Sequence, residues 1–264
     1  MLALYLSGTY KVKLIDCDVE NPNCHIFFDK RDTVDKKLCV FQPVIDMNLC
    51  NFCGKCQDVC QFNCLLVLDD DVMFFPNLCH PCKGCQFICP QKAISAGQRY
   101  IGDIKSFDTS SENLSVVYGL LNIGEARATP IIQELKSRED NCDINIYDSP
   151  PGAACPTVDT IKDSDMVMLV TEPTPFGLYD LKIAWCITKK LGLDSAIIIN
   201  RSNGKDEIID DFARESGTPV VTRIPYSRQF AENYSSGTID PDFFPGPLKK
   251  IMDFLKNRLP AETL

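Results

Sequence analysis

The sequence predicts an α/β fold, in which a mostly parallel sheet flanked by helices is interrupted by a small cysteine-rich α+β domain. Near-continuous apolar runs alternate with helical stretches through most of the 264 residues. This alternation is typical of parallel strands that are buried on both faces. Two regular runs of four cysteines lie between Cys50 and Cys89, where the alternation is absent. The two patterns together predict two domains, the smaller inserted into the larger.

The strands and helices of the larger domain follow from these apolar runs. Strands are predicted within residues 11–18, 142–152, 165–173, 195–200 and 218–225, and a strand pair within 99–107 and 113–121. Helices are predicted at 157–163, 177–191, 206–217 and 228–235, followed by a terminal amphipathic helix with a proline start. Strands that alternate with helices predict a parallel sheet covered on both faces. Ligands of such sheets bind at the carboxyl ends of the strands.

Domain boundaries follow from the place where the cysteine segment interrupts this pattern. Residues 1–43 and 98–264 are predicted to form the larger domain, and residues 44–97 the inserted one. The sequence has no Ser/Gly-rich linker at either junction, so we expect tight junctions between the two domains.

Each cysteine run has the form C-x2-C-x2-C-x3-C; the first run ends at Cys60 and the second begins at Cys79. A zinc site needs only two C-x2-C pairs for its four ligands. Extracellular disulfides are disfavoured by the α/β pattern and by the lack of a secretory signal. The segment 44–97 resembles a bacterial-type ferredoxin with two [4Fe–4S] clusters, in which the fourth cysteine of each run binds the other cluster. One departure is Gln61, where that family usually has proline.

The resemblance implies two ligand sets of four cysteines each. The first cluster is expected to bind Cys50, Cys53, Cys56 and Cys89. The second cluster is expected to bind Cys60, Cys79, Cys82 and Cys85.

Local geometry inside the segment is predicted as well. We expect the fourth cysteine of each run at the start of a short helix, and tight turns at Gly54 and Gly84 between ligands. The stretch LLVLDDDVMFFP between the runs predicts a hairpin with an acidic turn.

The remaining cysteines are scattered, and we interpret them as small buried residues rather than ligands. They are Cys17, Cys24, Cys39, Cys64, Cys142, Cys155 and Cys186.

The net charge of −9 argues against nucleic acid and anionic membranes as partners. No apolar run reaches the length of a membrane span. The first residues, MLALYLSGTYKVKL, lack a basic leader and a cleavage site, so we expect a cytoplasmic protein.

Five stretches taken in order carry a second resemblance that covers essentially the whole chain. They are LIDCDVENPN (14–23), GLLNIGEARATP (119–130), YDSPPGAACPTV (147–158), TEPTPFGLYDL (171–181) and INRSN (199–203). Together they resemble the MinD/ParA-type P-loop ATPases, specifically the Mrp-like subgroup with an inserted ferredoxin. Nitrogenase iron protein is a further relative. The resemblance implies ATP and magnesium as ligands of the complete form.

Site residues can be carried over from this family position by position. Asp148 matches the acid that holds magnesium through water, and Gly152 matches the glycine beside the terminal phosphate. Asp16 and Asp18 match the paired acids after the second strand, one of which positions the attacking water. Two further matches concern the base of the nucleotide. Asn200 matches the residue that reads the purine edge, and Pro225 with Tyr226 is expected to flank the base.

One part of the family pattern is missing from the sequence. The family has the Walker A loop G-K-G-G-x-G-K-T after its first strand, with a lysine that reaches the phosphates. No such motif occurs in the chain, and the first strand, the loop and the helix start are predicted to be absent. Lys11 and Lys13 cannot replace the loop lysine because they precede or lie within a strand. Either the sequence begins inside a longer protein or the protein has lost ATPase activity; we favour the first.

Three functions remain open at this point. The first is an iron–sulfur protein that transfers electrons, with nucleotide state coupled to the clusters in the complete form. The second is an electron-transfer ferredoxin on an inert scaffold, which is the behaviour predicted for the chain as given. The third is a cluster assembly scaffold or carrier. The expected partners are a redox or iron–sulfur protein and a second ATPase-like chain, in a homodimer or heterodimer.

Overall fold

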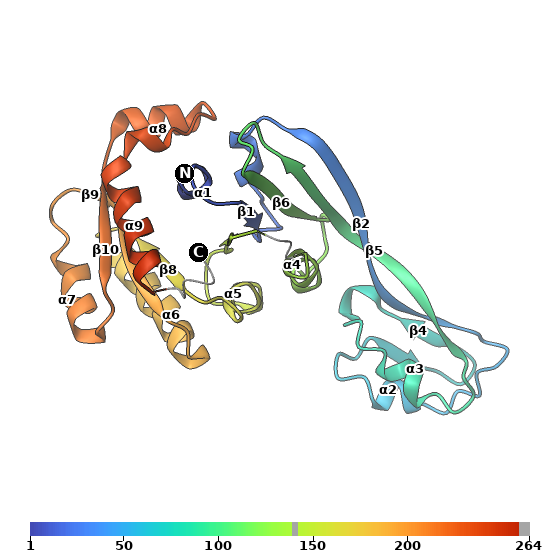
Figure 1. Cartoon of the computed structure of the whole chain (residues 1–264). Coiled ribbons are helices and arrows are strands. Elements are labelled where there is room, and N and C mark those ends of the chain that lie inside the picture. Colours follow the sequence, from blue (N-terminus) through green and yellow to red (C-terminus); the bar gives the residue numbers. More distant parts are fainter. Residues whose placement is uncertain (139–141, 259–264) are drawn as a thin grey trace.

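A computed structural model of the chain describes residues 1–138 and 142–258 (Figure 1). The strands of the larger domain form two sheets. The first has the order β2-β5-β6-β1-β7. Its strands are β1 (Val12–Asp16), β2 (Arg31–Ile45), β5 (Ile94–Asp108), β6 (Leu114–Leu121) and β7 (Ile144–Asp148). β1 pairs in parallel with β6 and β7, whereas β2–β5 and β5–β6 are antiparallel.

The second sheet is entirely parallel and has the order β10-β9-β8. Its strands are β8 (Val167–Thr171), β9 (Ser195–Ser202) and β10 (Val220–Pro225). The helices of the larger domain are α1 (Leu2–Ser7), α4 (Thr129–Lys136), α5 (Cys155–Ile161), α6 (Pro175–Leu191), α7 (Glu207–Ser216), α8 (Arg228–Ser235) and α9 (Pro245–Arg258). The predicted α/β class is confirmed, and each predicted strand and helix is present within a few residues of its expected position.

Helices cover both faces of the sheets because the central strands are apolar on both sides. All five residues of β1 are buried. Val12 and Leu14 pack on one face with α1 and α9, and Ile15 packs on the other face with α4. The core beside α9 also includes Ile198 of β9, so one hydrophobic core joins the two sheets. A third core packs α6 and α7 against β8 and β9.

The two sheets are separated between β7 and β8, which are the end strands of their respective sheets. In the described part of the chain, neither strand has a partner at its outer edge. Backbone groups at such an edge are left unpaired within the sheet. Side chains of the two edge strands are less buried than those of β1: no residue of β7 is fully buried, and Val170 of β8 is 62% exposed.

Close packing of α4 on β6 depends on Gly119. A Cβ atom added at Gly119 would lie against Ile131 of α4 and 2.7 Å from Cγ1 of Val19, both of which are buried. Overpacking of this kind costs about 1–3 kcal/mol of stability. We therefore expect Gly119→Ala to lower the free energy of unfolding by that amount in chemical denaturation. Gly246→Ala is the matched control, because no atom lies within 4 Å of its added Cβ; equal stability of the two variants would contradict this packing.

Strands β2 and β5 extend well beyond the first sheet as a two-stranded antiparallel arm (Figure 1). They pair from Arg31 with Asp108 to Ile45 with Ile94, whereas β6 pairs with β5 only from Gly102 onward. The cysteine segment sits at the far end of this arm. The proposed domain boundaries at 43/44 and 97/98 fall inside the arm, so the two strands run unbroken from one domain into the other.

The segment at the end of the arm, which we call the cysteine module (residues 46–93), is small. It contains one antiparallel hairpin of β3 (Leu65–Val67) and β4 (Val72–Phe74), as predicted from the sequence. Its two short α-helices are α2 (Lys55–Asp58) and α3 (Gly84–Ile88), and a 3-10 helix covers Pro76–Leu78. Among the helices of the described residues, none is long and apolar enough to cross a membrane.

Candidate functional site

The two cysteine runs fold as two copies of one local structure, in which Cys50 corresponds to Cys79 and Cys60 to Cys89. In both copies the residue after the second cysteine has a left-handed backbone and a short helix begins directly after it. Gly54 has φ 74° before α2, and Lys83 has φ 61° before α3. The third cysteine of each run therefore lies in the first turn of its helix.

Two sequence predictions about this local structure are wrong. The fourth cysteine follows each helix instead of starting one, because the helix begins directly after the left-handed residue that follows the second cysteine. Cys89 has ψ 112° directly after α3, as expected for a residue before proline, here Pro90. The turn predicted at Gly84 is made by Lys83 instead, while Gly54 turns as predicted.

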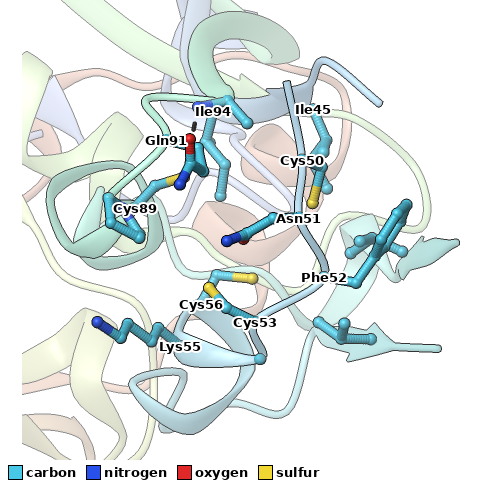
Figure 2. A pocket seen from close by; sticks show the side chains of 15 residues that line it. Ile45, Cys50, Asn51, Phe52, Cys53, Lys55, Cys56, Cys89, Gln91 and Ile94 are labelled. Carbon is cyan, nitrogen blue, oxygen red and sulfur yellow. Dashed lines mark hydrogen bonds between the residues drawn. The ribbon is translucent and has the colours of Figure 1, made fainter. Parts of the chain in front are cut away.

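The first predicted ligand set surrounds a single hollow (Figure 2). Cys50, Cys53 and Cys56 come from the first run, and Cys89 comes from the end of α3 in the second run. The hollow has an empty volume of about 370 Å³, part of it open to solvent. Its other lining residues are largely apolar: Ile45, Phe52, Val67, Val72, Ala93 and Ile94 among them. The structure thus brings together residues from both runs in the combination expected for the first cluster.

Most of the second predicted ligand set lies in the small core of the module. Cys79 is 5% exposed and belongs to this core with Leu65 and Val72, and Cys60 and Cys85 pack against it. Cys82 is exposed, as is its counterpart Cys53 in the first run. Cys50 and Cys56 of the first set pack on the same core, so the two sets share one apolar centre.

Burial changes the acidity of the thiols in both sets. It raises the pKa of Cys85 to about 11, with the neighbouring thiols of Cys79, Cys82 and Cys56 as further causes. Burial also raises the pKa of Cys56 and Cys79, and at Cys79 the charges of Arg127 and Arg99 oppose the rise. A thiol with a raised pKa is protonated at neutral pH. Iron binding as a thiolate therefore requires these side chains to release protons.

A second group of polar residues lies at the carboxyl ends of β1 and β7. Asp16 and Asp148 are opposite each other in the parallel register. Asp16 is fully buried, and its carboxylate accepts backbone N–H groups from Asp18 at 3.1 Å, Asn23 at 2.9 Å and Cys24 at 3.0 Å. Burial nevertheless raises the pKa of Asp16. Asp16 therefore shapes the loop after β1, and Asp148 at the adjoining strand end is exposed.

Cys24 joins this pair of acids, which the sequence did not predict. Its thiol donates to Oδ2 of Asp148 at 3.1 Å. Ligand atoms of Asp16, Cys24 and Asp148 lie within 4.8 Å of one another. The only sequence signal for this contact is the short spacing of Cys24 from the acids at 16 and 18.

The remaining residues predicted to bind nucleotide lie on both sheets. Gly152 has φ 91° and lies in the loop that follows Asp148 at the end of β7. Asn200 lies near the end of β9, where its Oδ1 accepts the N–H of Arg201. Pro225 ends the neighbouring strand β10, and Tyr226 beyond it is 60% exposed. The structure thus brings Asp16 together with Asp148, while Asn200 and Pro225 lie on the other sheet.

Burial of the scattered cysteines is only partly as predicted. Cys17 and Cys64 are buried, whereas Cys39, Cys155 and Cys186 are exposed. The exposed thiols lie on the two-stranded arm, at the first residue of α5 and on α6. At these positions no other described helix or strand packs over the cysteine side chain, which is why it is exposed.

Comparison with known proteins adds three findings. Residues 43–66 match the family of 4Fe-4S binding domains. The chain is 31% identical to the uncharacterized protein MJ0579 of Methanocaldococcus jannaschii over 242 residues, which are 89% of this chain and 82% of that protein. It is 33% identical to the uncharacterized protein MJ0578 of the same organism over 184 residues, 68% of this chain and 63% of that protein.

Solved structures with a similar fold include two archaeal proteins. One is the septum site-determining protein MinD complexed with Mg-ADP from Pyrococcus horikoshii, with a TM-score of 0.59 and 16% identity over 97% of this chain and 88% of that one. The other is the cell division ATPase MinD of Pyrococcus furiosus, with a TM-score of 0.57 and 16% identity over 96% and 90% of the two chains. At this identity the likeness concerns the fold, which is that of the MinD/ParA ATPases.

Proposed function

The chain belongs to the family of MJ0579 from Methanocaldococcus jannaschii, and from this premise we propose that it is an electron-transfer protein with two [4Fe–4S] clusters. A 4Fe-4S binding domain is present at residues 43–66, at the end of an arm on a scaffold with the MinD/ParA fold. The number of clusters, their ligands and the transfer of electrons are the new elements of this proposal.

One observation carries the proposal more than any other. Cys89, from the second run, lines the same hollow as Cys50, Cys53 and Cys56. A module that held one metal centre per run would place all four cysteines of a run around one hollow. The observed combination is the one expected when two clusters exchange their fourth ligands.

We assign Cys50, Cys53, Cys56 and Cys89 to the first cluster, and Cys60, Cys79, Cys82 and Cys85 to the second. When bound, such clusters supply one-electron redox couples. The protein's contribution is to fix the thiolates and to limit access of water. Leu65 and Val72 lie at the centre of the module and are 2% and 9% exposed; they limit the access of water to both ligand sets.

The scaffold is proposed to respond to nucleotide only in a form that has a phosphate-binding loop. In that form Asp148 would hold magnesium, Asp16 and Asp18 would position water, and Gly152, Asn200 and Pro225 would contact the nucleotide. The present sequence has no G-x-x-x-x-G-K-[ST] motif, which favours electron transfer without ATP for the chain as given. An in-frame glycine-rich loop in the coding DNA upstream of Met1 would support the longer form, and a stop codon close upstream would contradict it.

A redox titration followed by EPR tests the proposed function. Anaerobically prepared protein is expected to be reduced and reoxidised reversibly in one-electron steps. Magnesium and ATP are expected to leave the midpoint potentials unchanged, because the given sequence has no glycine-rich loop with a lysine that reaches the phosphates. Irreversible loss of the signal in the first cycle would contradict electron transfer, and a shift with ATP would contradict the inert scaffold.

We propose a redox protein as the electron donor or acceptor, and a second MinD/ParA-type subunit in a homodimer or heterodimer. One similar structure, from Aquifex aeolicus, is a MinC:MinD cell division protein complex, in which a protein of this fold is bound to another protein.

A further inference from the structure

Cys64 occupies a position that both halves of the cysteine module build in the same way. It corresponds to Ala93, because each lies four positions beyond the fourth cysteine of its run. Cys64 donates its backbone N–H to Sγ of Cys60 at 3.4 Å, and Ala93 donates its own to Sγ of Cys89 at 3.3 Å. The carbonyl of Cys64 also accepts the N–H of Phe75, directly after β4, and the carbonyl of Ala93 accepts the N–H of Asp46, directly after β2, both at 2.8 Å. This position is therefore held beside the fourth cysteine of each run.

A left-handed residue directs the side chain at this position. Asn63 has φ 49°, and its counterpart Lys92 has φ 50°. The N–H of Asn63 also bonds to the carbonyl of Cys60 at 3.2 Å. The chain thus reverses between Cys60 and Cys64, which returns residue 64 to the sulfur of Cys60.

In the first half this position carries a thiol where the second half has only a methyl group. Sγ of Cys64 lies 3.3 Å from Sγ of Cys60, and the residue is 4% exposed. Cys64 also belongs to the same buried core as Cys79. Since Ala93 is 2% exposed at the equivalent position, alanine is enough for packing, and the fold does not require sulfur at Cys64. The extra thiol therefore lies beside the assigned ligand Cys60 and in one core with the assigned ligand Cys79.

We propose that Cys64 is a spare ligand of the second cluster, which binds the iron held by Cys60 when the Cys60 thiolate is lost. This inference rests on the proposed two-cluster function. In the exchange, the iron–sulfur bond to Cys60 is replaced by an iron–sulfur bond to Cys64. The proton of the Cys64 thiol passes through solvent to the released Cys60 sulfur, which becomes a thiol, and no electron is transferred.

Iron content of anaerobically reconstituted variants tests this proposal. Wild type is expected to hold about eight irons per chain, the content of two cubane clusters. Cys60→Ala is expected to keep about eight, and Cys60→Ala/Cys64→Ala about four. Cys82→Ala, which removes a ligand without a spare thiol, is expected to keep about four. Cys186→Ala, an exposed cysteine on α6, controls for cysteine removal as such.

The equivalent position in the other half allows a gain-of-function test. Cys89→Ala is expected to hold about four irons, because Ala93 offers no sulfur. Cys89→Ala/Ala93→Cys is expected to return to about eight, because the new thiol would occupy the position of Cys64 in the first half. This variant pair keeps the proposal testable if Cys60→Ala does not fold.

The outcomes separate the two proposals. A wild-type content near four would contradict the two-cluster function itself. About eight irons in wild type with about four in Cys60→Ala would overturn the role of Cys64 alone, as would the absence of any gain from Ala93→Cys. If Cys60→Ala/Cys64→Ala still holds about eight irons, neither residue is a ligand, which overturns the spare ligand and the assignment of Cys60 together.

Discussion

Removal of iron with a chelator is expected to unfold the cysteine module while the scaffold stays folded. Four described residues form the buried core of the module, and two of these, Cys64 and Cys79, are cysteines; Ala93 is the other buried residue of this module (46–93). Its strands have three residues each, and its helices have four and five. Helices and hairpins of this size are not stable alone in water. Folding of the module is therefore expected to depend on the metal.

The scaffold has the opposite properties, because three larger hydrophobic cores hold its sheets and helices together. Among their described members, none is an assigned cluster ligand. Iron removal should therefore leave the scaffold's stability almost unchanged.

Hydrogen exchange of the protein before and after chelation measures both effects. Amides of the module, from Cys50 to Cys89, are expected to lose protection by at least about tenfold, which corresponds to about 1.4 kcal/mol of local opening free energy. Amides of β6 and β9 serve as the internal control and should keep theirs. Equal protection of the module with and without iron would contradict a metal-dependent fold.

Paired substitutions of assigned ligands are expected to have the second large effect. Cys53 and Cys89 come from different runs but are assigned to one cluster. Cys53→Ala/Cys89→Ala should therefore lose only that cluster and keep about four irons. Cys53→Ala/Cys82→Ala removes one ligand from each assigned set and should keep almost none.

The alternative assignment, with one cluster per run, changes the expected iron content of only one of these two variants. If each run held its own cluster, Cys53→Ala/Cys89→Ala would lose both clusters. Cys53→Ala/Cys82→Ala would lose both clusters under either assignment, so it defines complete loss. Iron and sulfide analysis of Cys53→Ala/Cys89→Ala, prepared in parallel, then distinguishes about four irons from almost none. Cys60 is left intact in both variants, so a spare thiol at Cys64 cannot alter the result.

The strands of the scaffold and the proposed role of the regularly spaced cysteines as ligands could be predicted, because both depend on local sequence. In the strand Val12–Asp16, Val12 and Leu14 pack on one face and Ile15 packs on the other. These apolar residues are visible in the sequence and predict a strand that is covered on both faces. The spacing of the cysteines within each run is a requirement of ligand geometry, so it too is visible in the sequence. The assignment of Cys89 to the same cluster as Cys50, Cys53 and Cys56 is expected only from the resemblance to ferredoxins.

Other features depend on contacts between distant segments and could not be predicted. The thiol of Cys24 meets Asp148, which lies far along the chain at the end of another strand. The left-handed residue before α3 is Lys83 and not Gly84, because the fold of the run fixes the position and glycine merely permits such a backbone. The scaffold's division between β7 and β8 likewise reflects strand order, which the individual strand patterns do not encode.

Iron and acid-labile sulfide analysis of anaerobically prepared protein, combined with EPR of the reduced state, tests the two-cluster assignment most directly. The expected result is about eight irons and eight sulfides per chain, with a reduced-state signal from both clusters. About four irons per chain, or zinc without sulfide, would contradict it.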